Sequence, residues 1–181
     1  MIEGKTIGAL IPAAGVGRRL GGPVAKQFLS LAGVPILVRT VGLFASWAAI
    51  DEIVVAVAAG EEEPVRELLA PVAAAKLRAV VRGGKERQQS VEAALAVSGS
   101  DIVLVHDAVR PFASRHLLDS VAVSAIAAGA AVAARPARLL PDVDSADHHL
   151  GGVDEAVVVA VPGAEELHVP SGYPAKFPGE K

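Results

Sequence analysis

The stretch TIGALIPAAGVGRRL (residues 6–20) decides the fold. It joins a short apolar run, 6–12, to a loop built from small residues and glycines. An apolar run of this length that ends at such a loop is typical of a buried strand, and the small residues let the backbone approach a ligand closely. We therefore expect the first strand to carry a binding loop at its carboxyl end.

From this stretch onward, strand-like and helix-like segments alternate. Further strands are predicted at 52–57, 77–81, 102–105 and 130–134, and helices at 35–47, 61–69, 86–97 and 114–127, the last with Ser114 as its N-cap. This alternation predicts an α/β fold, a mostly parallel sheet with helices on both faces. Ligand sites of such sheets lie at the carboxyl ends of the strands, so the loops 12–27, 82–90 and 106–111 should converge on one site.

The composition limits the class of protein. The chain has 181 residues, enough for one domain with a sizeable core, and 52% of them are hydrophobic but only 3% aromatic. The net charge of -3 argues against a nucleic-acid-binding surface, and the absence of cysteine excludes disulfides, thiolate catalysis and cysteine-based zinc sites. Neither a secretory signal nor a run of about 18 apolar residues is evident, and we expect no membrane association and a cytoplasmic location.

Cationic side chains accompany the first loop. Arg18, Arg19 and Lys26 stand beside glycines whose N–H groups are able to cradle phosphate oxygens. This combination suits a triphosphate, whose reacting phosphorus accumulates negative charge. The loop matches neither a Walker A motif nor a dinucleotide-binding fingerprint. A Gly-rich loop with solvated arginines is the alternative interpretation.

The second loop, RGGKERQQSV (82–91), ends a strand and opens a helix. Its backbone groups are candidates for reading the edge of a base, and Ser90 is a candidate hydrogen-bonding partner of that base. The alternative is a glycine turn followed by an exposed first helical turn.

The third segment, VHDAVRP (105–111), follows a buried strand. Asp107 is placed to hold Mg²⁺, which prefers carboxylates and phosphates, and Arg110 is placed to clamp a phosphate. Alternatively, Asp107 is a cap or an ion-pair partner of Arg110. His106 is expected to be structural rather than catalytic.

Four segments in this order resemble the 2-C-methyl-D-erythritol 4-phosphate cytidylyltransferases: PAAGVGRR (12–19), KQFLSLAGVPIL (26–37), GGKERQQSV (83–91) and VLVHDAVRP (103–111). The first is shared with many sugar nucleotidyltransferases, whereas the second and fourth together are far more specific. The resemblance runs from about residue 7 to residue 134 and implies a nucleotidyltransferase-like three-layer sandwich. The related ribitol-5-phosphate cytidylyltransferases share the specific motifs, so the nucleotide is better defined than the alcohol.

The resemblance also implies an activity in isoprenoid precursor synthesis. CTP and a divalent metal, Mg²⁺, would occupy the cleft, and the phosphate of the alcohol would attack the α-phosphorus, releasing pyrophosphate. On this basis the catalytic residues are Arg19 and Lys26, the metal ligand is Asp107 and the substrate-binding residue is Arg110. The nucleotide-binding residues are Ala13, Ala14, Gly15, Gly83, Ser90 and Ala108. A homodimer is the implied assembly.

The sequence departs from the family after residue 134. Leu139 and Leu140 stand where the family has Asp and Thr, and the later motifs, including a late Lys, are not recognisable. We therefore expect a nucleotide-binding domain at 1–134 and a divergent or truncated C-terminal segment at 135–181, partly irregular and not a separate domain, with one strand within 155–161. Two alternatives follow: another sugar-phosphate or ribitol-5-phosphate nucleotidyltransferase, or a nucleotide-binding module without turnover.

Overall fold

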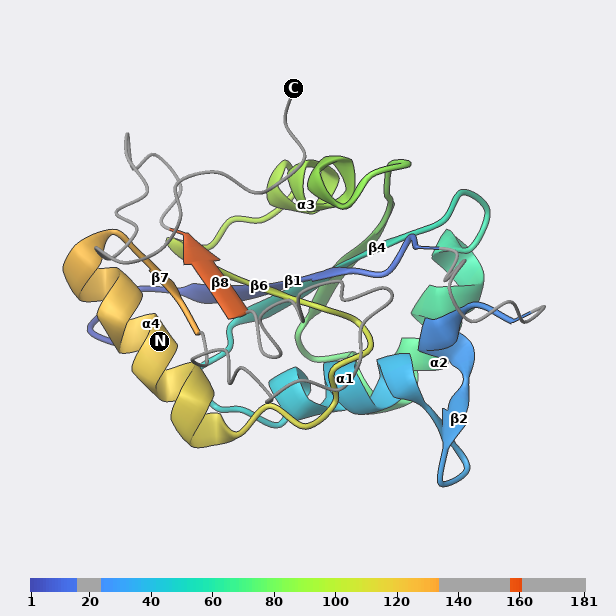
Figure 1. The fold of residues 1–181 in the computed structure, drawn as a ribbon, viewed down its shortest axis with the longest axis horizontal. Coiled ribbons are helices and arrows are strands. Elements are labelled where there is room, and N and C mark those ends of the chain that lie inside the picture. The colour runs from blue at the N-terminus through green and yellow to red at the C-terminus, as the bar shows by residue number, and fades with distance from the viewer. Residues whose placement is uncertain (16–23, 134–156, 161–181) are drawn as a thin grey trace, which may run out of the picture.

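The computed structural model describes residues 1–15, 24–133 and 157–160, and its centre is a six-stranded sheet with the order β5-β4-β1-β6-β8-β7 (Figure 1). Strands β5, β4, β1 and β6 pair in parallel, whereas β8 is antiparallel to both of its neighbours. The predicted mostly parallel sheet is therefore confirmed. The strands are β1 (Ile7–Pro12), β4 (Glu52–Val57), β5 (Leu77–Arg82), β6 (Ile102–His106), β7 (Ala130–Val132) and β8 (Val157–Ala160).

The three central strands are almost completely buried because both faces of the sheet are covered. Side chains alternate across the sheet, so Ile7, Ala9 and Ile11 of β1 enter one core cluster while Leu10 enters the other. This explains why these strands appear in the sequence as continuous apolar runs.

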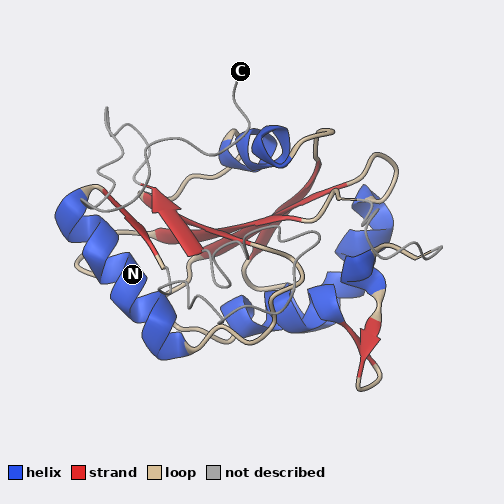
Figure 2. Ribbon diagram, in the orientation of Figure 1, coloured by secondary structure: helices blue, strands red, loops and turns tan. Residues whose placement is uncertain are grey.

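Helices cover both faces, as predicted (Figures 1 and 2). The larger core cluster joins the sheet to three helices: α1 (Ile36–Ala45), α2 (Glu62–Ala73) and α4 (Arg115–Ala128). The smaller cluster lies under α3 (Arg87–Leu95), which covers the opposite face. The sheet is thus the middle of three layers.

The helix boundaries follow local signals. The Ser114 hydroxyl accepts the N–H of Leu117 at 3.1 Å, which confirms it as the N-cap of α4, and Gly129 ends that helix in the left-handed region at φ 84°. Helix α2 passes its predicted end at residue 69 and continues to Ala73, which is buried. The predicted end was therefore four residues too early.

Short elements between the first loop and α1 were not predicted. A 3-10 helix, η2 (Lys26–Phe28), precedes a small hairpin of β2 (Ser30–Leu31) and β3 (Val34–Pro35). The hairpin turns at Gly33, whose φ is 78°, and Arg39 of α1 donates to the Leu31 carbonyl at 2.8 Å. These contacts set the direction in which η2 enters the body of the protein.

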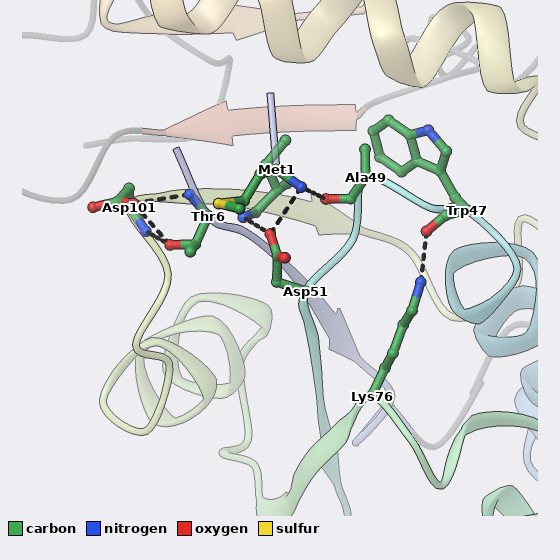
Figure 3. Close-up of polar contacts among 8 residues, drawn as sticks. Met1, Thr6, Trp47, Ala49, Asp51, Lys76 and Asp101 are labelled. Atoms are coloured by element: carbon green, nitrogen blue, oxygen red, sulfur yellow. Dashed lines mark hydrogen bonds and ion pairs between the residues drawn. The ribbon is translucent and has the colours of Figure 1, made fainter. Parts of the chain in front are cut away.

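The amino ends of the strands are tied together by polar contacts (Figure 3). The Asp51 carboxylate accepts the N–H of Ile7 at 2.8 Å and lies 3.3 Å from the amino group of Met1. Asp101 accepts both the N–H and the hydroxyl of Thr6 at 2.8 Å. Asp51 and Asp101 thus hold together the amino ends of β1, β4 and β6, at the end of the sheet opposite the predicted ligand loops.

The C-terminal segment contributes one described strand. The strand predicted within 155–161 is confirmed as β8, which inserts between β6 and β7. The other expectations for 135–181 lie outside the described residues. Within the described ranges, no helix combines the length and apolar character that a membrane span requires.

Candidate functional site

The carboxyl ends of β1, β5 and β6 meet around a cavity of about 370 Å³. This confirms the prediction that the three loops converge on one site. The cavity is lined by Pro12, Ala14, Gly15, Lys26, Gln27, Gly84, Lys85, Glu86, Arg87, Ser90, Asp107, Ala108 and Val109.

The first and second loops pack directly against each other. A Cβ atom on Gly83 would lie 2.7 Å from the Cβ of Ala14 and 2.7 Å from the hydroxyl of Ser90, closer than real Cβ contacts allow. Position 83 therefore requires glycine, because Ala14 and Ser90 leave no room for a larger side chain. The N–H of Gly83 continues the sheet by donating to the Val57 carbonyl at 2.7 Å. Three of the predicted nucleotide-binding residues are brought together in this way.

Side chains of α3 fix the second loop. Ser90 is buried, and its hydroxyl accepts the N–H of Gly84 at 3.1 Å and donates to the Glu86 carbonyl at 3.3 Å. Gln89 accepts the N–H groups of Lys85 and Glu86 through its side-chain oxygen, within a capping box that starts the helix. In this structure the Ser90 hydroxyl holds its own loop, and its contact with a base stays a prediction.

Gln27 links η2 to the first loop. Its side chain is 4% exposed, and its amide nitrogen donates to the Ala13 carbonyl at 2.7 Å. Ala13 is itself buried and donates its N–H to the Ala56 carbonyl at 2.6 Å, so both of its backbone groups are bonded within the chain. Ala14 and Gly15, not Ala13, line the cavity, and nucleotide contact by Ala13 stays a prediction.

Asp107 lies between two guanidinium groups. Its Oδ1 accepts from Arg87 at 3.1 and 3.2 Å, and its Oδ2 accepts from Nε of Arg110 at 3.0 Å. The ion pair with Arg110, which the sequence analysis gave as an alternative to metal binding by Asp107, is therefore present. The partnership with Arg87 was missed, although Arg87 stands three residues after Gly84, in the first turn of a predicted helix.

His106 supports the third segment from the core side. Its ring is 2% exposed and contacts Phe44 at a centroid distance of 5.0 Å, and its Nε2 lies 2.8 Å from the Arg110 carbonyl. Burial lowers the pKa of His106, although the hydrogen bond to Arg110 and the charge of Asp107 oppose this. Because a carbonyl oxygen only accepts, Nε2 is the donor of this bond, in agreement with the structural role expected for His106.

A second cavity of about 1040 Å³ adjoins the first and shares five lining residues with it. This second cavity extends along the carboxyl ends of β4 and β5, past Ala58 and Arg82. The predicted catalytic Arg19, like Arg18, lies outside the described residues.

The described residues do not by themselves provide a complete set of ligands for a divalent metal. No group of three or more His, Asp or Glu side chains able to hold a metal occurs within the described parts of the chain. A Mg²⁺ ion that serves a nucleotide needs one or two carboxylates, because phosphates and water supply its other ligands. Asp107 meets this need at the cavity wall, provided that one of its arginine contacts is exchanged for the metal.

The family model of 2-C-methyl-D-erythritol 4-phosphate cytidylyltransferase matches residues 7–148. The chain belongs to this family. The match includes all three loops of the cavity and continues beyond residue 134, where we expected the resemblance to end.

Curated members of this cytidylyltransferase family align with most of the chain. The protein of this name from Symbiobacterium thermophilum is 47% identical over 132 residues, which cover 72% of the chain and 54% of that protein. The one from Geobacter metallireducens is 38% identical over 165 residues, covering 88% of the chain and 67% of that protein. The chain thus spans about half the length of the first of these relatives.

Solved structures of the family share the fold. The 4-diphosphocytidyl-2C-methyl-D-erythritol synthase of Anaerococcus prevotii superimposes with a TM-score of 0.66 at 26% identity, covering 88% of this chain and 71% of that one. The 2-C-methyl-D-erythritol 4-phosphate cytidylyltransferase of Thermus thermophilus gives a TM-score of 0.59 at 32% identity, covering 84% and 69%. The three-layer nucleotidyltransferase fold expected from the resemblance is thereby confirmed.

Proposed function

We propose that this chain transfers a cytidylyl group from CTP to 2-C-methyl-D-erythritol 4-phosphate, giving the CDP-alcohol and pyrophosphate for isoprenoid precursor synthesis. One observation carries the proposal: the three loops that hold the family's motifs meet at one cavity, with Lys26, Arg87 and Asp107 in its wall. Curated relatives named for this activity support the choice of nucleotide and alcohol.

The reaction needs positioning and charge stabilisation rather than a covalent enzyme intermediate. A phosphate oxygen of the alcohol attacks the α-phosphorus of CTP in line. A new P–O bond forms as the bond to the β-phosphate breaks, and pyrophosphate leaves with that electron pair. Negative charge increases on the oxygens around the α-phosphorus, and cationic groups fixed nearby lower the barrier.

We take the residue roles from the family resemblance, and the position of Lys26 in the cavity wall supports the role given to it. Lys26, together with Arg19, stabilises the transition state, and Arg110 holds the phosphate of the alcohol. Ala14, Gly15 and Ala108 lie against the nucleotide, with Ala13 behind them, and Gly83 with Ser90 defines the place of the cytosine.

Asp107 is the proposed ligand of Mg²⁺. The metal, when bound, neutralises phosphate charge and orients the leaving group. A metal held by Asp107 would compete with Arg87 and Arg110 for the carboxylate, and the two guanidinium groups would then be able to donate to phosphate oxygens. Residues 1–134 form the nucleotide-binding unit of this proposal, in a homodimeric cytoplasmic protein.

The decisive experiment measures pyrophosphate release from CTP and Mg²⁺ with 2-C-methyl-D-erythritol 4-phosphate, with ribitol 5-phosphate, and with neither. We expect release that depends on the erythritol derivative. Release with ribitol 5-phosphate alone would replace the proposed substrate by the alternative one. Binding of CTP without release under any condition would leave a nucleotide-binding module and would contradict the proposed turnover.

A further inference from the structure

The turn from Asp107 to Arg110 carries several of the proposed site residues, and three of its four carbonyl groups are held by hydrogen bonds. The Asp107 carbonyl accepts the N–H of Arg110 at 3.2 Å, and the Arg110 carbonyl accepts from His106 at 2.8 Å. The Ala108 carbonyl accepts from the hydroxyl of Thr40 at 2.9 Å. The turn is therefore fixed from the core side, while Asp107, Ala108 and Val109 line the cavity.

Thr40 is unusual among the core-facing residues of α1. It is fully buried, and the other buried positions of the helix are the apolar Leu37, Val41 and Phe44. A buried hydroxyl lowers stability unless it is hydrogen-bonded, so an apolar side chain would serve a purely packing role better. The Thr40 hydroxyl lies 3.1 Å from the Ile36 carbonyl of its own helix, and its shorter contact leaves the helix for Ala108.

We propose that Thr40 is a positioning residue of the site: through the Ala108 carbonyl it ties α1 to the turn that presents Asp107 and Ala108 to the ligand. The two residues are far apart in the sequence: Ala108 lines the cavity, and Thr40 lies in the core of the protein behind it. Removal of the hydroxyl leaves a buried carbonyl without its partner, and the turn must move or open to satisfy it. The expected effect on CTP binding rests on the function proposed above, whereas the expected effect on the conformation of the turn does not.

Two pairs of variants isolate the hydroxyl. Thr40→Val keeps the shape of the side chain and removes the hydroxyl, whereas Thr40→Ser keeps the hydroxyl. Thr40→Ala and Thr40→Ser both lack the methyl group and differ only in the hydroxyl, so this pair decides the matter if Thr40→Val does not fold. Ser124→Ala is the control, because Ser124 is exposed and its hydroxyl donates within its own helix, to the Ser120 carbonyl at 2.7 Å.

The first measurement is amide hydrogen exchange of residues 105–112 and, as an internal reference, of α1. We expect Thr40→Val and Thr40→Ala to accelerate exchange in the turn by about tenfold, with Thr40→Ser and Ser124→Ala close to the unaltered chain. The second is the dissociation constant for CTP with Mg²⁺, expected to rise by about tenfold in the variants without a hydroxyl and to return in Thr40→Ser.

The outcomes separate the two proposals. If exchange in the turn is the same with and without the hydroxyl, Thr40 does not position the turn and the inference is overturned, whatever happens to CTP. If the unaltered chain does not bind CTP, the proposed function fails, while the exchange data still decide the role of Thr40. Loss of CTP affinity in Thr40→Ser equal to that in Thr40→Ala would also contradict the inference.

Discussion

Lys26 and Gln27 are neighbours in η2 with different tasks. Gln27 is buried and bonds to the Ala13 carbonyl, whereas Lys26 is half-buried in the cavity wall. The amide of Gln27 therefore anchors η2 against the first loop and sets where the ammonium group of Lys26 is able to act.

Replacement of Lys26 by Ala should reduce turnover far more than it reduces CTP affinity. We expect turnover to fall by about 100-fold and the dissociation constant for CTP to rise by less than about threefold, because the charge acts mainly in the transition state. Pyrophosphate release and calorimetric titration with CTP measure the two quantities. Lys5→Ala, which alters an exposed lysine at the opposite edge of the sheet, is the control. Equal losses of turnover and affinity would contradict the role given to Lys26.

Gly83→Ala should disrupt the contact between the first and second loops. The new methyl group would meet Ala14 and Ser90 at 2.7 Å, so we expect CTP affinity to fall by at least about tenfold and stability to fall by about 1–3 kcal/mol. Gly42→Ala is the matched control, because that glycine lies within α1 with open space around it; there, alanine should stabilise the protein by about 0.5–1 kcal/mol. Titration with CTP and urea unfolding test both variants, and unchanged affinity in Gly83→Ala would exclude the loops' contact as a determinant of binding.

At the scale of single residues, the charged residues and glycines of the three loops were recognisable from the sequence. The side chains that hold these loops in place were not. Lys26, Gly83 and Asp107 stand out because glycines and charged residues follow apolar strands. The supporting partners Gln27 and Thr40 bond to carbonyl groups distant in the sequence, and no local pattern reports such contacts.

Helix α4 is an element whose start was predicted and whose stability is open to a direct test. Ser114→Ala removes the side-chain acceptor of the Leu117 N–H, and we expect the free energy of unfolding to decrease by about 1 kcal/mol. Ser114→Asp restores an acceptor and should recover most of that loss. Urea denaturation measures both, and an unchanged midpoint in Ser114→Ala would show that the cap is not needed.

The longer elements were predictable because burial leaves a recognisable pattern of apolar residues in the sequence. Helix α1 shows Leu37, Val41 and Phe44 on one face, and the buried strands are uninterrupted apolar runs. Elements of two or three residues, such as η2, β2 and β3, are too short to show any period. Their conformation depends on tertiary contacts, including that of Arg39 with Leu31.

On the scale of the whole molecule, the class of fold was predictable and the order of the strands was not. Alternating strands and helices require a parallel sheet with covered faces. They do not determine which strand joins which edge, and the position of β8 between β6 and β7 has no signature in the sequence of either neighbour. Long-range pairing decides that order.

Stability should decrease in acid, because carboxylates at the amino edge of the sheet are hydrogen-bonded in the folded state. Burial raises the pKa of Glu52, but hydrogen bonds from Ser98 and Gly99 and the charge of Arg78 together outweigh burial, so the pKa lies below its ordinary value of 4.5. Hydrogen bonds from Thr6 lower the pKa of Asp101 below 3.8. Groups with a lowered folded pKa stabilise above their unfolded pKa, and this contribution is lost as the pH falls through the folded value.

Urea unfolding between about pH 7 and about pH 3 provides the test of this acid dependence. We expect the free energy of unfolding to decrease below pH 4.5, and Glu52→Gln to show a smaller decrease over the same range. An identical decrease in Glu52→Gln would assign the acid sensitivity to other groups.

The place of β8 also has a consequence for the order in which the sheet is assembled during synthesis. Four parallel strands are complete once residue 106 has left the ribosome, and their pairing involves only residues made by then. Strand β7 is synthesised next, but it reaches the sheet only through β8, which follows it by some two dozen residues. One side of β6 therefore has no partner strand until β8 has been synthesised, and the native pairing of β7 depends on the same event.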